Sequence, residues 1–418
     1  MSIDISSSKS AEPDDLPVAT EQADRRSFLK TSAAGLMIVS PSIAFGSQAN
    51  STVELGLLGC GSRGNWIAPL FTEFAPVRWV AAADVIRTNL TTTASKLNID
   101  AGRSFYGPDA YKELAAAKVD VVVIETPPYY HPAHAQAAVD AGKHVFLAKP
   151  VAVDVPGCRT IAESGKKAAG KKLSYWVDFQ TRARPVYQEV AERIHRGDVG
   201  KPALAQVFYY AGRVKPSEVR TGSDEGHQRI LNMYSDKVLG GDIIVEQNIH
   251  VIDVANWLLK ARPVRACGTG GRTDWKGTEF DSGDAWDHFA VTYWYPGDVC
   301  ASFSSNQLTR SFADLCVRVI GQDGCADTHY AGLVRITGKK AWLGTEKDDT
   351  FKGGAVGNIQ AFVNSVREGK PINNGDAAVE SNLTAILGRM AAYRSSIVTW
   401  DEMMKSTEKL EANLKLAW

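Results

Sequence analysis

A glycine-rich turn near residue 60 constrains the fold more than any other feature of the sequence. An apolar run from Val53 to Leu58 enters Gly59-Cys60-Gly61-Ser62-Arg63-Gly64, and Asp84 ends the next apolar run, 20 residues after Gly64. Between a strand and a helix, the first glycine permits a tight bend, the second lets the backbone approach a pyrophosphate, and the third lets the helix pack closely. The helix N-terminus offers N–H groups to the phosphates. The motif predicts a dinucleotide site that contains Gly59, Gly61, Ser62, Arg63, Gly64 and Asp84.

Asp84 also predicts which dinucleotide binds. A carboxylate at this position accepts a hydrogen bond from a ribose 2′-OH and repels a 2′-phosphate, which favours NAD over NADP. Arg87 keeps NADP as an alternative. A plain glycine turn in a sheet protein is the structural alternative to a nucleotide site.

Residues 50–179 predict a Rossmann domain, because short apolar runs alternate with helical segments as in a parallel sheet. The expected strands are Val53 to Leu58, Val77 to Ala83, Ser104 to Tyr106, Val119 to Ile124, His144 to Leu147 and Leu173 to Phe179. The expected helices are Asn65 to Phe74, Thr88 to Leu97, Asp109 to Ala117, Pro132 to Ala141 and Val155 to Ala169.

Residues 180–418 predict a second, α+β domain for substrate binding and oligomerisation, with an open and mostly antiparallel sheet. Its expected strands are Ala203 to Tyr210, Val264 to Gly268, His288 to Tyr295, Val299 to Phe303, Leu315 to Ile320 and Thr328 to Tyr330. Its expected helices are Arg184 to His195, Gly241 to Leu259, Asn358 to Arg367 and Ala377 to Ser396, with an irregular loop at Val214 to Tyr234.

Residues 1–49 resemble a twin-arginine export signal. Arg25-Arg26-Ser27-Phe28-Leu29-Lys30 precedes an uncharged, weakly apolar stretch, and small residues predict cleavage after Gly46 or Ala49. The signal implies the twin-arginine export machinery as a partner and a periplasmic or otherwise exported location. An uncleaved membrane anchor is the alternative.

Charge and cysteine usage exclude other classes of function. The chain has 418 residues with 47 Lys plus Arg against 47 Asp plus Glu, so it has no basic field to hold nucleic acid. The six cysteines are scattered without a C-x-x-C pair, and we expect no metal site.

Two further motifs carry a specific resemblance. Thr126-Pro127-Pro128-Tyr129-Tyr130-His131 is followed by Gly142-Lys143-His144-Val145 and Lys149-Pro150, and Gly240-Gly241-Asp242 precedes Glu246 and His250. With the glycine turn, this pattern resembles the Gfo/Idh/MocA family of oxidoreductases. The resemblance implies a nicotinamide near Thr126, Pro127, His131 and Lys149, with Lys149 and His250 as catalytic groups. It also implies a dimer or tetramer.

The implied chemistry suits oxidation of a hydroxyl. A neutral histidine takes the O–H proton near pH 7, and a lysine ammonium stabilises the charge that develops on oxygen. Glu246 lies four residues before His250, so a continuous helix would place both on one face, where the carboxylate orients the ring. The family usually has Glu where this chain has Ala148, so a carboxylate expected near Lys149 is absent.

Each residue also has a structural interpretation: Lys149 as a solvated turn lysine, His250 as a core histidine, and Asp253 as a surface or capping acid. Substrate-binding candidates are Gln180, Arg182, Tyr187 and Tyr234, together with His250.

The sequence thus predicts an NAD-dependent oxidoreductase that acts on a hydroxyl of a sugar, sugar acid, cyclitol or glycoside. The alternatives are a redox-neutral, NAD-dependent glycoside hydrolase or lyase and a non-catalytic, NAD-binding sugar sensor.

Overall fold

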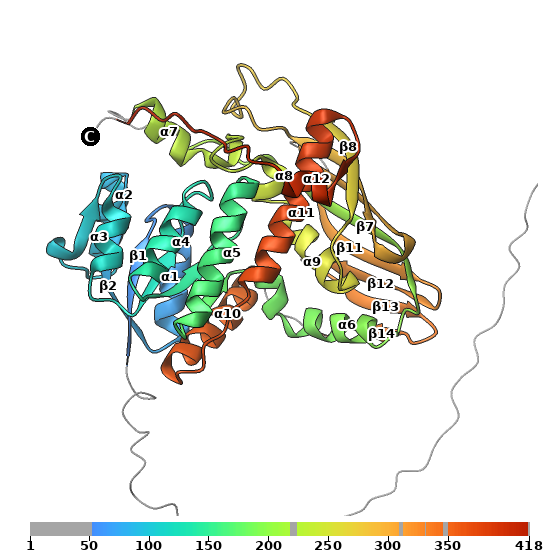
Figure 1. Cartoon of the computed structure of the whole chain (residues 1–418), viewed down its shortest axis with the longest axis horizontal. Coiled ribbons are helices and arrows are strands. Elements are labelled where there is room, and N and C mark those ends of the chain that lie inside the picture. Colours follow the sequence, from blue (N-terminus) through green and yellow to red (C-terminus); the bar gives the residue numbers. More distant parts are fainter. Residues whose placement is uncertain (1–51, 218–223, 309–311, 331, 346–349, 417–418) are drawn as a thin grey trace, which may run out of the picture. The chain divides into compact units, whose positions relative to one another are not determined.

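The computed structural model describes residues 52–217, 224–308, 312–330, 332–345 and 350–416. The predicted export signal lies outside these residues and stays a prediction. Two β-sheets, one of six and one of nine strands, organise the described chain (Figure 1). No helix within the described ranges has the length and apolar character needed to cross a membrane.

The first sheet is parallel throughout and has the order β3-β2-β1-β4-β5-β6. Its strands are β1 (Val53–Leu58), β2 (Val77–Asp84), β3 (Ser104–Tyr106), β4 (Val121–Ile124), β5 (His144–Leu147) and β6 (Tyr175–Val177). From β1 the chain adds β2 and β3 on one side of the sheet, and then β4, β5 and β6 on the other side. The strand order therefore reverses between β1 and β4, and a ligand crevice is expected at the carboxyl ends of these two strands.

Helices cover both faces of this sheet because the side chains of each buried strand alternate between them. In β4, Val121 and Val123 belong to the apolar cluster that contains α1, α2 and α10, whereas Val122 and Ile124 belong to the cluster with α3, α4 and α5. These helices are α1 (Ser62–Phe74), α2 (Arg87–Lys96), α3 (Ala110–Ala116), α4 (His131–Asp140), α5 (Val155–Gly170) and α10 (Thr350–Arg367).

The second sheet has the order β14-β13-β12-β11-β7-β10-β9-β8-β15, and only the β7–β10 pair is parallel. Its strands are β7 (Pro202–Ala211), β8 (Arg265–Gly271), β9 (His288–Tyr295), β10 (Val299–Gln307), β11 (Asp314–Gly321), β12 (Gly324–His329), β13 (Val334–Gly338), β14 (Trp342–Leu343) and β15 (Val398–Thr399). The predicted fold class, a parallel Rossmann sheet plus an open, mostly antiparallel sheet, is therefore confirmed.

Helices α6, α9 and α11 pack on the second sheet. The helices of this part are α6 (Pro185–His195), α7 (Glu225–Leu231), α8 (Ile243–Glu246), α9 (Ile249–Leu259), α11 (Gly375–Arg394) and α12 (Trp400–Met404). Short 3-10 turns are η1 (Ala101–Arg103), η2 (Gln180–Ala183), η3 (Met233–Ser235) and η4 (Pro296–Asp298). The division at residues 179 and 180 stays a prediction, and α10 returns from the second half to pack on α1.

Some expected elements have other bounds in the structure, such as the strand expected at Thr328 to Tyr330, which is β12, and two expectations differ in kind. The predicted helix from Gly241 to Leu259 is two helices, because Asn248 N–H bonds to the Ile243 carbonyl across a widened turn and α8 ends at Glu246. The expected loop from Val214 to Tyr234 contains α7, whose first turn is capped by the Asp224 carboxylate on His227 N–H.

Candidate functional site

The glycine turn leaves room for a ligand at one position and not at the other two. Gly59 has φ +97°, and a Cβ on it would lie 2.7 Å from the Glu125 carbonyl carbon. A Cβ on Gly64 would lie 2.1 Å from the Gly59 oxygen. On Gly61, a Cβ would meet only the Asn89 amide at 4.0 Å. The first and third glycines are therefore required by the protein itself, whereas Gly61 faces open space.

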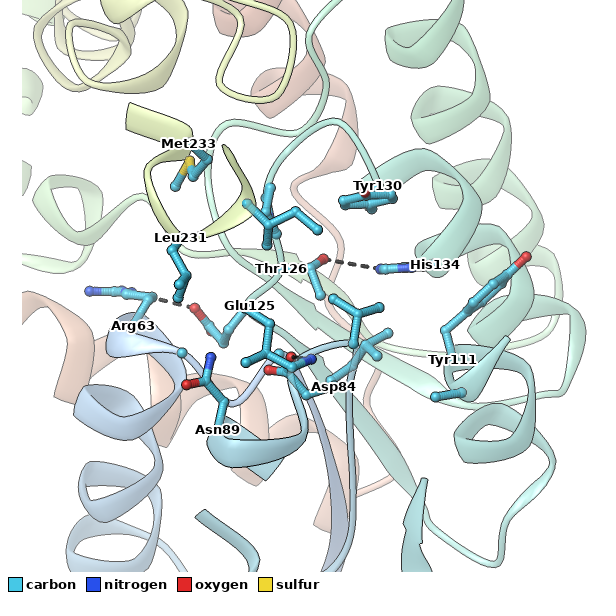
Figure 2. A pocket seen from close by; sticks show the side chains of 18 of the residues that line it. Arg63, Asp84, Asn89, Tyr111, Glu125, Thr126, Tyr130, His134, Leu231 and Met233 are labelled. Carbon is cyan, nitrogen blue, oxygen red and sulfur yellow. Dashed lines mark hydrogen bonds and ion pairs between the residues drawn. The ribbon is translucent and has the colours of Figure 1, made fainter. Parts of the chain in front are cut away.

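A pocket opens over this turn (Figure 2). Its wall includes seven of the predicted cofactor residues: Gly59, Gly61, Ser62, Arg63, Asp84, Thr126 and Pro127. The N-cap of α1 makes no side-chain hydrogen bond, so its first turn can receive an anion. Asp84 accepts from the backbone N–H groups of Cys60 and Ile86, each at 2.6 Å, which fixes the carboxylate at the pocket edge. The residues present fit a dinucleotide.

The far wall of the pocket comes from the second half of the chain. Ile230, Leu231, Met233 and Leu416 line it, and Figure 1 shows the C-terminal segment running beside α7. Hydrogen bonds hold this segment: Arg229 donates to the Ala412 carbonyl at 2.7 Å, and the Asp154 carboxylate accepts from the Leu410 N–H at 2.9 Å. The end of α7 and Leu416 together form a roof over the nucleotide pocket, and the rest of the segment 405–416 holds Leu416 in place. Sequence reasoning missed this roof.

His131 does not line this pocket. Its ring is buried, with Nδ1 and Nε2 each 2.7 Å from the carbonyl oxygens of Pro150 and Thr126. Burial lowers the pKa of His131 to about 4. The ring therefore ties the Thr126 turn to the segment after Lys149. The next histidine, His134, is the one that reaches the wall, with Nδ1 3.0 Å from the Thr126 hydroxyl (Figure 2).

Lys149 is a largely buried lysine held by Glu246, with only 16% of its side chain exposed, rather than a solvated turn lysine. Its Nζ donates to the Glu246 carbonyl at 2.5 Å and lies 3.4 Å from Glu246 Oε1. The break after α8 makes the first contact possible, because the His250 N–H bonds to Gln247 and leaves the Glu246 carbonyl without its helical donor. Burial lowers the pKa of Lys149, and the Glu246 charge opposes this.

Glu246 therefore contacts Lys149 and does not orient the His250 ring. The expected helical face shared by Glu246 and His250 does not form, because the two residues lie on either side of the break between α8 and α9. His250 Nδ1 is buried without a hydrogen-bond partner, and the ring lies 5.6 Å from that of Tyr330. Burial, and then the positive charges of Lys149 and Arg63, lower the pKa of His250. The lysine, the histidine and Arg63 thus lie within electrostatic reach of one another.

Two buried carboxylates that sequence reasoning missed complete this cluster. Glu125 follows β4 and Asp178 follows β6, and both contact Arg63: Nη2 is 2.5 Å from Asp178 Oδ2, and Nε is 3.4 Å from Glu125 Oε2. Asp178 also accepts from the Asn358 amide at 2.7 Å. Both acids stand at the carboxyl ends of strands in a parallel sheet, where ligands bind, and that position was the available signal.

The substrate candidates separate into two groups. Tyr234 lines the pocket, and burial raises its pKa to about 12. Gln180 does not line the pocket; it is buried, and its Oε1 accepts from the Tyr330 hydroxyl at 3.4 Å.

Arg182 and Tyr187 have structural partners instead. The Arg182 guanidinium makes a two-point contact with Asp253, with Nε and Nη2 each 2.8 Å from a carboxylate oxygen. Tyr187 is 2% exposed and packs in the main apolar core. Substrate binding by these two is therefore not favoured, and Asp253 is a buried ion-pair partner rather than a surface or capping acid.

The described residues contain one group with metal-ligand side chains close together, Asp314, Cys316 and His329 on the second sheet. The two ring nitrogens of His329 are already directed at carboxylates, 2.7 Å from Asp314 and 3.2 Å from Asp327. Arg318 pairs with the same Asp327 oxygen at 2.7 Å. This group lies outside the nucleotide pocket, and we assign it no role.

Comparison with known proteins agrees with the geometry. Residues 53–179 match the model described as oxidoreductase family, NAD-binding Rossmann fold, and residues 187–327 match the GFO/IDH/MocA C-terminal domain. The scyllo-inositol 2-dehydrogenase (NAD(+)) of Bacillus subtilis is 26% identical over an alignment of 364 residues that covers 82% of this chain and 95% of that protein. An inositol 2-dehydrogenase of Acidothermus cellulolyticus is 30% identical over 218 residues, 51% of this chain and 56% of that protein.

Solved structures show the same fold. The aldose-aldose oxidoreductase of Caulobacter crescentus aligns with a TM-score of 0.67 at 18% identity, over 84% of this chain and 100% of that one. The scyllo-inositol dehydrogenase of Lactobacillus casei with bound NAD(H) and scyllo-inositol aligns with a TM-score of 0.66 at 18% identity, with 84% and 100% covered. The chain belongs to the Gfo/Idh/MocA family of oxidoreductases, and its parallel-sheet part is an NAD-binding Rossmann domain.

Proposed function

We propose that this protein oxidises a hydroxyl of a neutral sugar, cyclitol or glycoside with NAD. The observation that carries the proposal is the convergence of Lys149 and a neutral His250 beside the nucleotide pocket. Glu125 connects the nucleotide pocket with the Lys149–His250 pair, because it lines the pocket and also lies within electrostatic reach of Lys149.

Oxidation of an alcohol releases a hydride from carbon and a proton from oxygen. NAD, when bound, accepts the hydride. The protein must take the proton, and His250 is suited to this because its lowered pKa keeps the ring neutral and Nδ1 is buried without a partner. The Lys149 ammonium has three N–H donors, and Glu246 engages only part of them, so one can point to the substrate oxygen and stabilise its developing negative charge.

The charges of the site favour a neutral substrate over a sugar acid. Its two cations, Arg63 and Lys149, are each already paired with a carboxylate, Arg63 with Asp178 and Lys149 with Glu246. A substrate carboxylate would find no cation without an anionic neighbour in this cluster, and its burial would be costly. The names of the relatives support the same class, since those from Bacillus subtilis and Acidothermus cellulolyticus are inositol dehydrogenases.

The test has two parts. Mass spectrometry of the nucleotide released from denatured protein should give NAD. A panel of scyllo-inositol, myo-inositol, glucose, glucuronate and an aryl glycoside should then give NADH in proportion to oxidised product for a neutral substrate. Protein that neither contains nor binds a nicotinamide nucleotide would exclude the proposal. Preference for glucuronate would contradict the charge argument, and release of the aglycone without NADH would indicate a redox-neutral cycle instead.

Two further properties are proposed on sequence grounds. The Arg25-Arg26 signal directs the folded chain out of the cytoplasm, and replacement of both arginines by lysine should retain it there, as cell fractionation would show. The family resemblance implies a dimer or tetramer. Light scattering of the purified protein measures this directly.

A further inference from the structure

Glu125 is a buried carboxyl group without a hydrogen-bond donor. The residue is 7% exposed, and neither Oε1 nor Oε2 accepts a hydrogen bond from the protein. Arg63 Nε lies 3.4 Å from Oε2, which is close enough for an ion pair but does not have hydrogen-bond geometry. Buried carboxyl oxygens are rarely left without a donor, so this group points to a ligand.

The position of Glu125 identifies which part of the ligand it meets. It follows β4 directly and lines the nucleotide pocket beside Thr126 and Pro127 (Figure 2). In a sheet of this order, β1 to β3 bind the adenosine half of a dinucleotide, and the half that begins with β4 receives the nicotinamide. Asp84 at the end of β2 and Glu125 at the end of β4 are therefore expected to contact opposite halves of a bound dinucleotide.

The surroundings of Glu125 favour its neutral form. The charged and titratable groups that face it are Arg63 from α1, Asp178 after β6, Lys149 after β5 and Tyr234 from η3. Arg63 is shared with Asp178, which has the shorter contact at 2.5 Å and a second hydrogen bond from Asn358. Burial raises the pKa of Glu125 to about 8, although Arg63 opposes this. Near neutral pH the carboxyl is therefore mostly protonated.

A protonated carboxyl offers one O–H donor and one C=O acceptor. A primary carboxamide offers the complement, a C=O acceptor and an N–H donor, and the two groups form a cyclic pair of hydrogen bonds. NAD has one primary carboxamide, on its nicotinamide ring. We propose that neutral Glu125 pairs with the nicotinamide carboxamide of NAD and thereby fixes the ring beside Lys149 and His250. This inference rests on NAD binding and is independent of the substrate.

The pairing makes NAD affinity depend on pH in a defined direction. Only the protonated form of Glu125 can donate to the carboxamide oxygen, so affinity should be full only well below pH 8, the pKa of the group being about 8. It should fall as pH rises through the pKa of Glu125, and binding above that pH should take up a proton. A glutamine at this position donates and accepts at every pH, so it should bind NAD without this dependence.

The experiment compares NAD with 3-acetylpyridine adenine dinucleotide, in which a methyl group replaces the carboxamide NH2. Dissociation constants are measured by calorimetry between pH 6.5 and 9.5 for the wild type, Glu125→Gln and Glu125→Ala. Glu113→Gln serves as the control, because Glu113 is an exposed carboxylate on α3. The wild type and the control should prefer NAD by about tenfold, the usual value of one hydrogen bond. Glu125→Gln should keep that preference at all pH values, and Glu125→Ala should bind both nucleotides about equally.

Three results would overturn the inference. These are equal binding of both nucleotides by the wild type, a tenfold preference that persists in Glu125→Ala, and an unchanged alkaline loss of affinity in Glu125→Gln. The first of these needs no variant, so a poorly folded alanine variant does not weaken the test. Failure of every protein, wild type included, to bind either nucleotide would instead contradict the proposed function.

Discussion

Replacement of Gly61 by alanine should weaken NAD binding and leave the fold intact. The backbone at Gly61 has φ −77° and ψ −160°, which alanine adopts without strain. The new Cβ would meet only the Asn89 amide, at 4.0 Å. Gly61 is the N-cap of α1, where alanine costs about 1 kcal/mol or less relative to glycine.

The loss of affinity follows from the ligand's requirement for that space. A methyl group on Gly61 would displace the pyrophosphate from the N–H groups of the first turn of α1. Loss of one charge-assisted hydrogen bond there costs roughly 1.5–3 kcal/mol, which is about 10- to 150-fold in the dissociation constant. Calorimetric titration with NAD measures this change, and thermal unfolding of the free protein measures its stability.

Gly64→Ala is the matched comparison. Its Cβ would lie 2.1 Å from the Gly59 carbonyl oxygen, so α1 must move away from β1. Such overpacking costs about 1–3 kcal/mol, and the melting temperature of the free protein should fall. A Gly61→Ala protein that binds NAD as tightly as the wild type, or one that melts as early as Gly64→Ala, would refute the assignment of this turn to the pyrophosphate.

Asp84→Ser should narrow the preference for NAD over NADP, measured as the ratio of the two dissociation constants, because it removes the carboxylate that repels a 2′-phosphate. Deletion of 407–416 should speed NADH release in stopped-flow displacement, because it removes Leu416 from the roof of the pocket; an unchanged rate would show that the roof does not retain the nucleotide. Arg182→Ala should lower the free energy of unfolding by about 3–5 kcal/mol, because the buried Asp253 carboxylate loses its cationic partner and keeps the Ser381 hydroxyl as a neutral donor, while NAD affinity stays unchanged. Wild-type kcat/KM should hold its plateau below pH 6.5, because the pKa of His250 is lowered and the base loses its function only when protonated; a fall centred at or above pH 6.5 would contradict a buried base.

The Rossmann half was predictable from sequence because its signals are local. The strands β1, β3 and β5 begin and end at the predicted residues, since each is a short run that a polar residue precedes, and β1 and β3 are followed directly by a glycine. The glycine turn and Asp84 identified the pocket for the same reason.

The second half depended on contacts that are distant in the sequence. Arg182 looked available for substrate because its partner, Asp253, is 71 residues away. The break between α8 and α9 falls at Gln247 and Asn248, and neither is a glycine or proline that would predict a helix end. Because of this break, the Glu246 carbonyl is free to accept from Lys149.

The residue before Lys149 gives an example within the site of a contact that is distant in the sequence and was therefore not predicted. Ala148 in place of the family glutamate implied that Lys149 is either freer or differently partnered, and the structure shows the second, with Glu246 as its carboxylate partner. A carboxylate that follows a buried strand is easily taken for a loop residue unless the sheet order is known.

The account depends most on Lys149 and His250 acting together on one hydroxyl beside bound NAD. The direct measurement is the single-turnover rate of NADH formation in the Lys149→Ala, His250→Ala and double variants, with NAD affinity determined in parallel. We predict that each single variant slows this step by roughly 10²- to 10⁴-fold with NAD affinity kept within a few fold, and that the double variant is little slower than the worse single one. A double variant that forms NADH at the wild-type rate would contradict the account.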